Sequence, residues 1–137
     1  MSNNVRFSTS LHILTLLAHG KGELVSSEYL AGSINVNAAI IRKELSNLRK
    51  HGLVESKEGK GGGNKLAKAA GSILLSDIYQ AVRESPLLGR KNSPNPDCLI
   101  GRQINGHLET LFIASEQSLL DNLSRQTLAG FTRKFKG

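Results

Sequence analysis

Lysine and arginine side chains gather between residues 42 and 68 and could together bind a polyanion. This stretch holds eight Lys or Arg against three Asp or Glu, a net charge of +5, and the whole 137-residue chain carries +7. A concentrated basic stretch attracts nucleic acid, because binding releases the counterions condensed on the phosphates. The same charge could instead form a solvated face that only keeps the protein soluble. The pattern around the charge has to decide between these alternatives.

Cys98 is the single cysteine of the chain, so it cannot form an internal disulfide. Arg90, Lys91 and Arg102 are near it in sequence, and basic neighbours favour the reactive thiolate. Cys98 is therefore a candidate redox sensor, although the adjacent Asp97 disfavours the thiolate. The alternative is a small buried hydrophobe at a helix start, which is how free cysteine usually behaves.

The remaining reactive residue types are not spaced to act together. The histidines at positions 12, 19, 51 and 107 are far apart and have no cysteine or carboxylate at metal-ligand spacing. No Ser/His/Asp, paired-carboxylate or Cys/His arrangement indicates catalysis. The glycine tract at 59–65 lacks the Gly-Lys-Ser/Thr ending of a phosphate-binding loop. We therefore expect no enzyme, no metal site and no cofactor.

A helix over residues 37–51 is predicted to position the basic side chains. Ile41, Leu45 and Leu48 recur at the spacing of one apolar helical face, and the basic residues lie off that face. Gly52 is suited to the left-handed conformation that commonly ends a helix.

A shorter helix, over residues 26–33, is expected just before it. Ser26 or Ser27 is its expected N-cap, and residues 35–37 form a tight connection to the next helix. Its expected buried side consists of Tyr29, Leu30 and Ile34. Two short helices, the second amphipathic and basic on its outer face, are typical of a helix-turn-helix.

The other elements complete a winged form of this motif. Segments 53–57 and 64–67 around a glycine-rich tip predict a β-hairpin, the wing. Helices are expected over 5–18, 73–83, 99–122 and 124–135, and Gly101 and Gly106 suggest that the long one becomes regular nearer Asn105. The expected fold is mainly α with a small β-hairpin wing: a winged helix-turn-helix plus a long C-terminal dimerisation helix.

Three regions follow from these elements: a DNA-binding domain over 1–83, a connector over 84–98 and a helical dimerisation region over 99–137. The likeliest partner for a long helix outside a compact core is a second copy of itself, since most soluble oligomers are two-fold symmetric. The alternative is that the helix packs back on its own domain. No apolar window reaches membrane-spanning length and no signal peptide is visible, so we expect a cytoplasmic protein without a membrane partner.

A family resemblance is carried by Leu45, Leu48, Arg49, Gly52-Leu53-Val54, Ser56, Gly59, Gly62-Gly63, Leu66-Ala67, Ile73, Leu75, Asp77-Ile78 and Ala81. At these spacings the chain resembles the Rrf2 family of bacterial winged-helix transcriptional regulators, the family of IscR and CymR. The expected order of elements agrees across nearly the whole chain. The resemblance implies a homodimeric repressor with the long helices at its interface, the third helix in the major groove and the wing near the minor groove.

Two positions of the wing depart from the family pattern. Glu58 stands where family members often have Arg, and Asn64 stands where they usually have an aromatic residue. Because a carboxylate at the wing tip would repel phosphate, contact with DNA would rest on Lys57, Lys60 and Lys65. We therefore expect the third helix to contribute more to DNA binding than the wing.

The cysteines form the third departure. Cluster-binding members supply three cysteines from the connector and the start of the long helix, and here residues 90–107 hold Cys98 alone. Iron–sulfur clusters need several thiolate or imidazole ligands, and Cys98 with His107 cannot hold one within a single chain. We therefore expect a variant without the three-cysteine iron–sulfur site.

The candidate site residues divide into two groups by the part of double-stranded DNA they would contact. Arginine pairs with guanine edges and asparagine with adenine, so the expected base-reading residues are Asn37, Ala38, Ala39, Arg42 and Lys43, the alanines allowing close approach. Residues that would contact phosphates, and so position the protein, are Ser26, Ser27, Arg49, Lys57, Lys60 and Lys65.

The sequence thus predicts a homodimeric transcriptional repressor that reads a pseudo-palindromic operator. One rival is a winged-helix module that binds another protein, to which Glu58 and Asn64 give weight. A second rival is a regulator that responds to a small molecule lying between the wing domain and the long helix.

Overall fold

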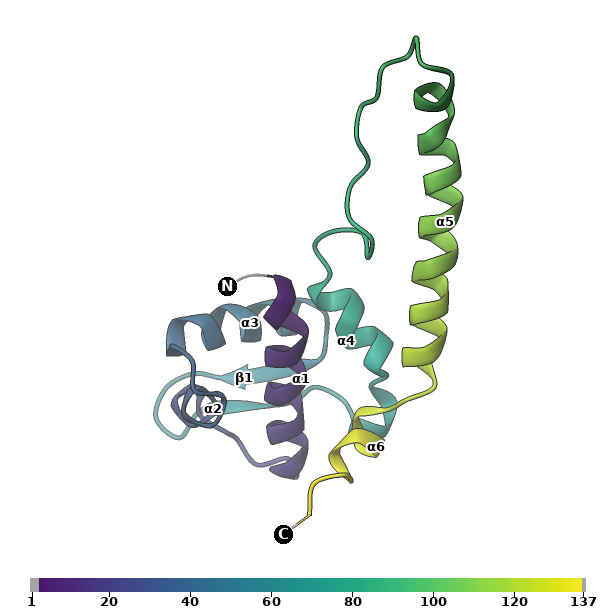
Figure 1. Cartoon of the computed structure of the whole chain (residues 1–137). Helices are drawn as coiled ribbons and strands as arrows, with labels where there is room; N and C mark the ends of the chain where they lie inside the picture. Colours follow the sequence, from purple (N-terminus) through teal and green to yellow (C-terminus); the bar gives the residue numbers. More distant parts are fainter. Residues whose placement is uncertain (1–2, 137) are drawn as a thin grey trace.

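The structure is a computed structural model, and it describes residues 3–136. Its elements in chain order are α1 (Asn3–His19), α2 (Ser27–Ile34), α3 (Ala38–Lys50), β1 (Val54–Lys57), β2 (Gly63–Leu66), the 3-10 turn η1 (Ala70–Ser72), α4 (Leu75–Val82), α5 (Leu99–Ser124) and α6 (Leu128–Thr132) (Figure 1). The mainly helical fold with a two-stranded antiparallel hairpin and a long C-terminal helix confirms the expected fold class.

The hydrophobic core surrounds α1, which packs against α2, α3, α4 and α6. The three residues predicted as the apolar face of α3, Ile41, Leu45 and Leu48, are all buried in this core. Fully buried partners from the neighbouring elements are Ile13, Leu14, Leu30, Ile73, Ile78 and Leu128. Burial of this apolar surface holds the helix-turn-helix as one body.

The first helix of the helix-turn-helix, α2, begins and ends as its sequence predicts. Ser26 is the N-cap and its Oγ accepts a hydrogen bond from the Tyr29 amide at 3.1 Å. Asn35 ends the helix in the left-handed conformation, with φ of 60°. The expected burial of Tyr29 is wrong, since this residue is 62% exposed. Leu30 and Ala31 form the buried side of this short helix. Tyr29, the residue before them, lies on its exposed side.

The wing is a short hairpin in which Val54 pairs with Leu66 and Lys57 pairs with Gly63. Its tip needs glycine, as expected from the tract at 59–65, because Gly59 and Gly61 have positive φ of 87° and 77°. Gly62 has no room for a side chain, since a Cβ there would lie 2.1 Å from the carbonyl oxygen of Lys57. An isolated β-bridge between Val25 and Asn64 attaches the hairpin to the segment before α2.

The long helix α5 has 26 residues and extends away from the rest of the molecule, with the connector running beside it to its start (Figure 1). It is regular from Leu99, so the expectation of a regular start near Asn105 is wrong. Cys98 caps the helix, and Gly101 allows the connector to approach closely, because a Cβ there would lie 2.7 Å from the Asn95 carbonyl oxygen.

The last helix, α6, is shorter than the expected 124–135 and returns to the helical body. It packs against α1, and its Leu128 is fully buried in the core. The connection into α6 is held by a β-bridge between Leu74 and Thr127. Of the region expected to serve dimerisation, α5 therefore extends outward while α6 forms part of the core.

Candidate nucleic-acid interface

The outer face of α3 presents basic residues to solvent. Arg42 and Lys43 are exposed, as is Ala39 one turn earlier, while Ala38 is half-buried. Asn37 is the N-cap, and its Oδ1 accepts a hydrogen bond from the Ala39 amide at 2.7 Å. Because the oxygen caps the helix, the amide nitrogen of Asn37 is the group left to meet a base. The five expected base-reading residues thus lie on the first two turns of α3.

Arg42 is held by an acidic residue that the sequence analysis did not single out. Its Nη2 lies 3.3 Å from Oε1 of Glu28 on α2, and both side chains are largely exposed. An exposed ion pair of this kind contributes about 0–1 kcal/mol, so a guanine or a phosphate could replace the carboxylate. Glu28 therefore orients Arg42 without fixing it.

A polar groove of about 560 Å³ lies between the helix-turn-helix and the wing. Of the expected phosphate contacts, it brings together Ser26, Ser27, Arg49 and Lys57, and Arg42 also lines it. Lys60 and Lys65 do not line the groove. Glu28 and Glu58 bring negative charge to its wall.

Asn64 attaches the wing to the helix-turn-helix. Its side chain is buried, and its Nδ2 donates to the carbonyl oxygen of Val25 at 2.9 Å. Its Oδ1 accepts from Ser56 Oγ at 2.5 Å, and Ser56 in turn accepts from Arg49 Nη1 at 2.9 Å. Because both polar atoms of its side chain are hydrogen-bonded inside the protein, Asn64 has no free group to offer DNA. The residue instead fixes where the wing stands.

The lysines of the wing differ in their surroundings. Lys57 and Lys60 are exposed near the tip, together with Glu58. Lys65 lies on the second strand, and its Nζ is 3.9 Å from the Glu55 carboxylate. The two lysines at the tip are therefore better placed than Lys65 to contact phosphate.

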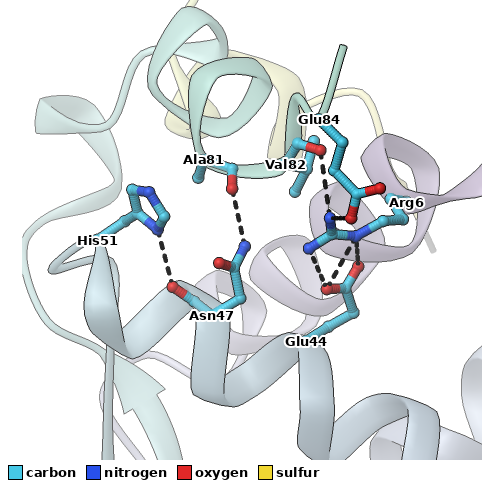
Figure 2. A network of polar contacts seen from close by, with 7 residues as sticks. All are labelled: Arg6, Glu44, Asn47, His51, Ala81, Val82 and Glu84. Atoms are coloured by element: carbon cyan, nitrogen blue, oxygen red, sulfur yellow. Dashed lines mark hydrogen bonds and ion pairs between the residues drawn. The ribbon is translucent and has the colours of Figure 1, made fainter. Parts of the chain in front are cut away.

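The inner face of α3 carries a buried acid, Glu44, which is 2% exposed. Arg6 of α1 binds it through two nitrogens, with Nε 2.9 Å from Oε2 and Nη2 2.7 Å from Oε1 (Figure 2). This hydrogen-bonded carboxylate raises the pKa of Arg6 above its usual value. Arg6 also contacts the Glu84 carboxylate and the Val82 carbonyl oxygen. A charged residue beside Ile41, Leu45 and Leu48 on the apolar face is the sequence signal that could have revealed this pair.

One turn further along α3, Asn47 makes a second contact with α4. Its Nδ2 donates to the Ala81 carbonyl oxygen at 2.8 Å (Figure 2). His51, at the end of α3, lies 2.9 Å from the Asn47 carbonyl oxygen. No local sequence pattern pointed to Arg6, Asn47 or Glu84, because their partners lie far away along the chain.

A family model described as an iron-dependent transcriptional regulator, Rrf2, matches residues 3–134. The chain belongs to the Rrf2 family. It is therefore a winged-helix transcriptional regulator, and the resemblance seen in its sequence is confirmed.

Two relatives of this Rrf2-family chain show how far the similarity extends. It is 31% identical over 126 residues, 91% of this chain and 92% of that protein, to YwnA of Bacillus subtilis, which is provisionally named an HTH-type transcriptional regulator. It is 38% identical over 72 residues, 53% of this chain and 46% of that protein, to IscR of Cereibacter sphaeroides. The similarity to YwnA covers both the winged helix-turn-helix and the long helix.

The solved structure of CymR, the global cysteine regulator of B. subtilis, has the same fold. It superimposes with a TM-score of 0.72 over 99% of this chain and 98% of that chain, at 23% sequence identity. At this identity the likeness concerns the fold, including the winged helix and the long helix that follows it.

The residues of this chain do not fit the iron that the family description names. Protein-bound iron needs several thiolate, imidazole or carboxylate ligands. Within residues 3–136, no three His, Cys, Asp or Glu side chains lie close enough to hold a metal ion. Cys98 is exposed at the start of α5, and its Sγ accepts from the Gly101 amide at 3.4 Å. In the single chain its side chain is exposed rather than buried.

Among the described helices of this Rrf2-family chain, none is both long and apolar enough to cross a membrane.

Proposed function

We propose that the chain acts as a homodimeric repressor in the cytoplasm and reads a pseudo-palindromic operator with α3 in the major groove. The observation that carries this proposal is the exposed face of α3, where Ala39, Arg42 and Lys43 follow one another at helical spacing. Small residues let the helix approach base edges, and the basic residues supply donors for guanine and phosphate. The groove beside α3 adds Arg49 and Lys57 as phosphate contacts.

Dimerisation through α5 is supported by the apolar side chains that this helix leaves in solvent. Its large hydrophobic residues exposed by 40% or more are Leu99, Ile100, Ile104, Leu111 and Ile113. A second copy of the helix would remove these side chains from water. Two-fold pairing would also place two recognition helices on half-sites about one helical turn apart.

Cys98 is the proposed point of redox sensing. It is exposed, and it lies at the N-terminus of α5, where it is the N-cap. Oxidation at the start of α5 would change the helix that joins the two copies, and so alter operator binding.

Selection of bound fragments from a bacterial genome, with and without an oxidant, tests the proposed function. A DNA reader enriches fragments that share an inverted repeat, and an oxidant changes their recovery. Recovery of fragments without a common sequence would contradict operator reading. It would favour the rival in which the winged helix binds a protein.

A further inference from the structure

The last turn of α4 lies between α3, the proposed recognition helix, and the long helix α5, and it forms hydrogen bonds with both. We propose that Arg6, Glu44, Asn47 and Glu116 are positioning residues that hold α3 at a fixed place relative to α5 through this turn. In the dimer they would set the distance between the two recognition helices. The inference rests on the proposed function, because it requires a dimer joined through α5.

On the α3 side, two successive turns of the helix are fastened. The Glu44 carboxylate accepts hydrogen bonds from the guanidinium of Arg6. The same guanidinium donates to the Val82 carbonyl oxygen at 3.4 Å and contacts the Glu84 carboxylate (Figure 2). Asn47 donates to the neighbouring Ala81 carbonyl oxygen. The last carbonyl groups of a helix have no partner within it. These contacts satisfy two of them from α1 and α3.

The Arg6–Glu44 pair fixes direction as well as distance. A guanidinium that binds a carboxylate through two nitrogens holds both groups in one plane. The Glu44 side chain is 2% exposed and that of Arg6 is 14% exposed, so water competes little for either group. Loss of Arg6 would leave the buried Glu44 carboxylate without a counterion, which makes the pair a restraint on how α3 lies against α1 and the end of α4.

On the α5 side, a single carboxylate gathers three groups from α4 and the connector. Glu116 lies 2.6 Å from Arg83 Nε, and it accepts the Tyr79 hydroxyl at 3.4 Å and the Leu87 amide at 3.3 Å. Burial, followed by the charge of Glu116, raises the pKa of Tyr79, so its hydroxyl stays protonated as the donor. Glu116 therefore binds α4 and the start of the connector to the middle of α5.

The two sets of contacts meet in the segment from Tyr79 to Leu87, which runs from α4 into the connector. Tyr79, Arg83 and Leu87 are bound to α5, while Ala81, Val82 and Glu84 are bound to α3 and α1. Residues that contact α5 alternate with residues that contact α3 or α1 along one short segment. A shift of α5 would therefore move α3 with it. Ile41, Leu45 and Leu48 hold α3 in the core independently. Breaking the polar contacts would therefore loosen the alignment of α3 with α5 without unfolding the core.

The test measures affinity for paired half-sites whose centres are separated by the preferred spacing or by one or two base pairs more or less. The variants are Glu44→Gln, Asn47→Ala and Glu116→Gln in the full chain, and Glu23→Gln is the control because it removes an exposed charge from the α1–α2 loop. The affinity of each protein for DNA that holds a single half-site is measured as well.

For the wild-type protein and Glu23→Gln we expect a clear preference for one spacing. In each positioning variant we expect the ratio of the affinity at the best spacing to the affinity at a shifted spacing to fall by about fivefold or more. This is the range of a typical coupling between sites. Affinity for one half-site should change much less, since these residues do not face DNA.

A wild-type spacing preference that all the folded variants retain would overturn the inference and leave the proposed function intact. An equal loss of affinity at every spacing would also overturn the inference, because such a loss would indicate that these residues contribute to stability alone. Absence of any spacing preference in the wild-type protein would overturn the proposed dimeric function and the inference with it. Should Glu44→Gln fail to fold, Asn47→Ala and Glu116→Gln decide, since neither adds a buried unpaired charge.

Discussion

Arg42 and Lys60 illustrate two ways in which a basic side chain can serve DNA binding. Arg42 projects from the exposed face of the recognition helix beside Glu28, and Lys60 lies at the exposed tip of the wing. A residue that meets base edges gives sequence preference, whereas one that meets phosphate gives affinity for any sequence. The two residues should therefore respond differently to the same substitution.

For Arg42→Ala we expect a loss of discrimination at one base-pair position in each half-site, corresponding to about 1–3 kcal/mol. For Lys60→Ala, the matched control, we expect equal weakening on all sequences and a salt dependence that is less steep by about one counterion. Binding to an operator and to its single-base variants over a range of salt concentrations measures both effects. An equal loss on every sequence for Arg42→Ala would assign Arg42 to phosphate.

Cys98 gives a second prediction at the residue scale. The exposed thiol should make operator binding sensitive to a mild oxidant such as hydrogen peroxide, and Cys98→Ser should remove that sensitivity while leaving binding in reductant unchanged. Gel shifts of both proteins with and without peroxide measure this. An oxidant response that persists in the variant would show that the thiol is not the sensor.

Single residues were the hardest part of the molecule to predict. Asn64 departs from the family pattern, and only its burial against Val25 and Ser56 reveals that it supports the wing. Glu44 lies in the predicted recognition helix, but its partner Arg6 is 38 residues away along the chain. Contacts between such distant positions leave little trace in local patterns, so sequence reasoning missed them.

Elements were predicted more completely, because their signals are local. The spacing of Ile41, Leu45 and Leu48 located α3 and its buried face, and Ser26 and Gly52 marked helix ends. The predicted helix 99–122 begins where α5 begins, but its regular part was placed too late, near Asn105, because Gly101 and Gly106 were taken to weaken the helix. The lack of a side chain at Gly101 instead serves the close approach of the connector, a tertiary requirement.

The wing supplies a prediction at the element scale. Gly62→Ala should destabilise the hairpin, since the added Cβ would lie 2.1 Å from the Lys57 carbonyl oxygen and the strands would have to separate. Gly71→Ala is the matched control, because no atom lies within 4 Å of its added Cβ. We expect a lower melting temperature for Gly62→Ala and an unchanged or slightly higher one for Gly71→Ala. Equal melting temperatures would contradict the tight turn.

At the scale of the whole molecule, the question is what covers α5. None of its 26 residues is buried in the single chain, although it carries Ile104, Leu111 and Ile113. The sequence indicated a partner helix for this reason. In the proposed dimer, a second copy of the helix would complete this apolar face.

Ile104→Glu should convert the dimer to a monomer, because pairing would bury the added carboxylate in an apolar contact. Lys134→Glu, on the tail beyond α6, is the control, because it also introduces a carboxylate but lies outside this face. Sedimentation equilibrium gives the mass of each protein in solution. A wild-type protein with the mass of one chain, or an Ile104→Glu variant that remains dimeric, would contradict an interface through this part of α5.

Membership of the Rrf2 family and the exposed basic face of α3 support sequence-specific DNA reading over binding of a protein partner. The most direct test is the affinity for a selected operator and for a scrambled sequence of equal length, measured from low to physiological salt. The account predicts a steep fall in affinity with salt on both sequences and tighter binding to the operator by about 10³-fold or more. Equal affinity for the two sequences, or binding that does not depend on salt, would contradict it.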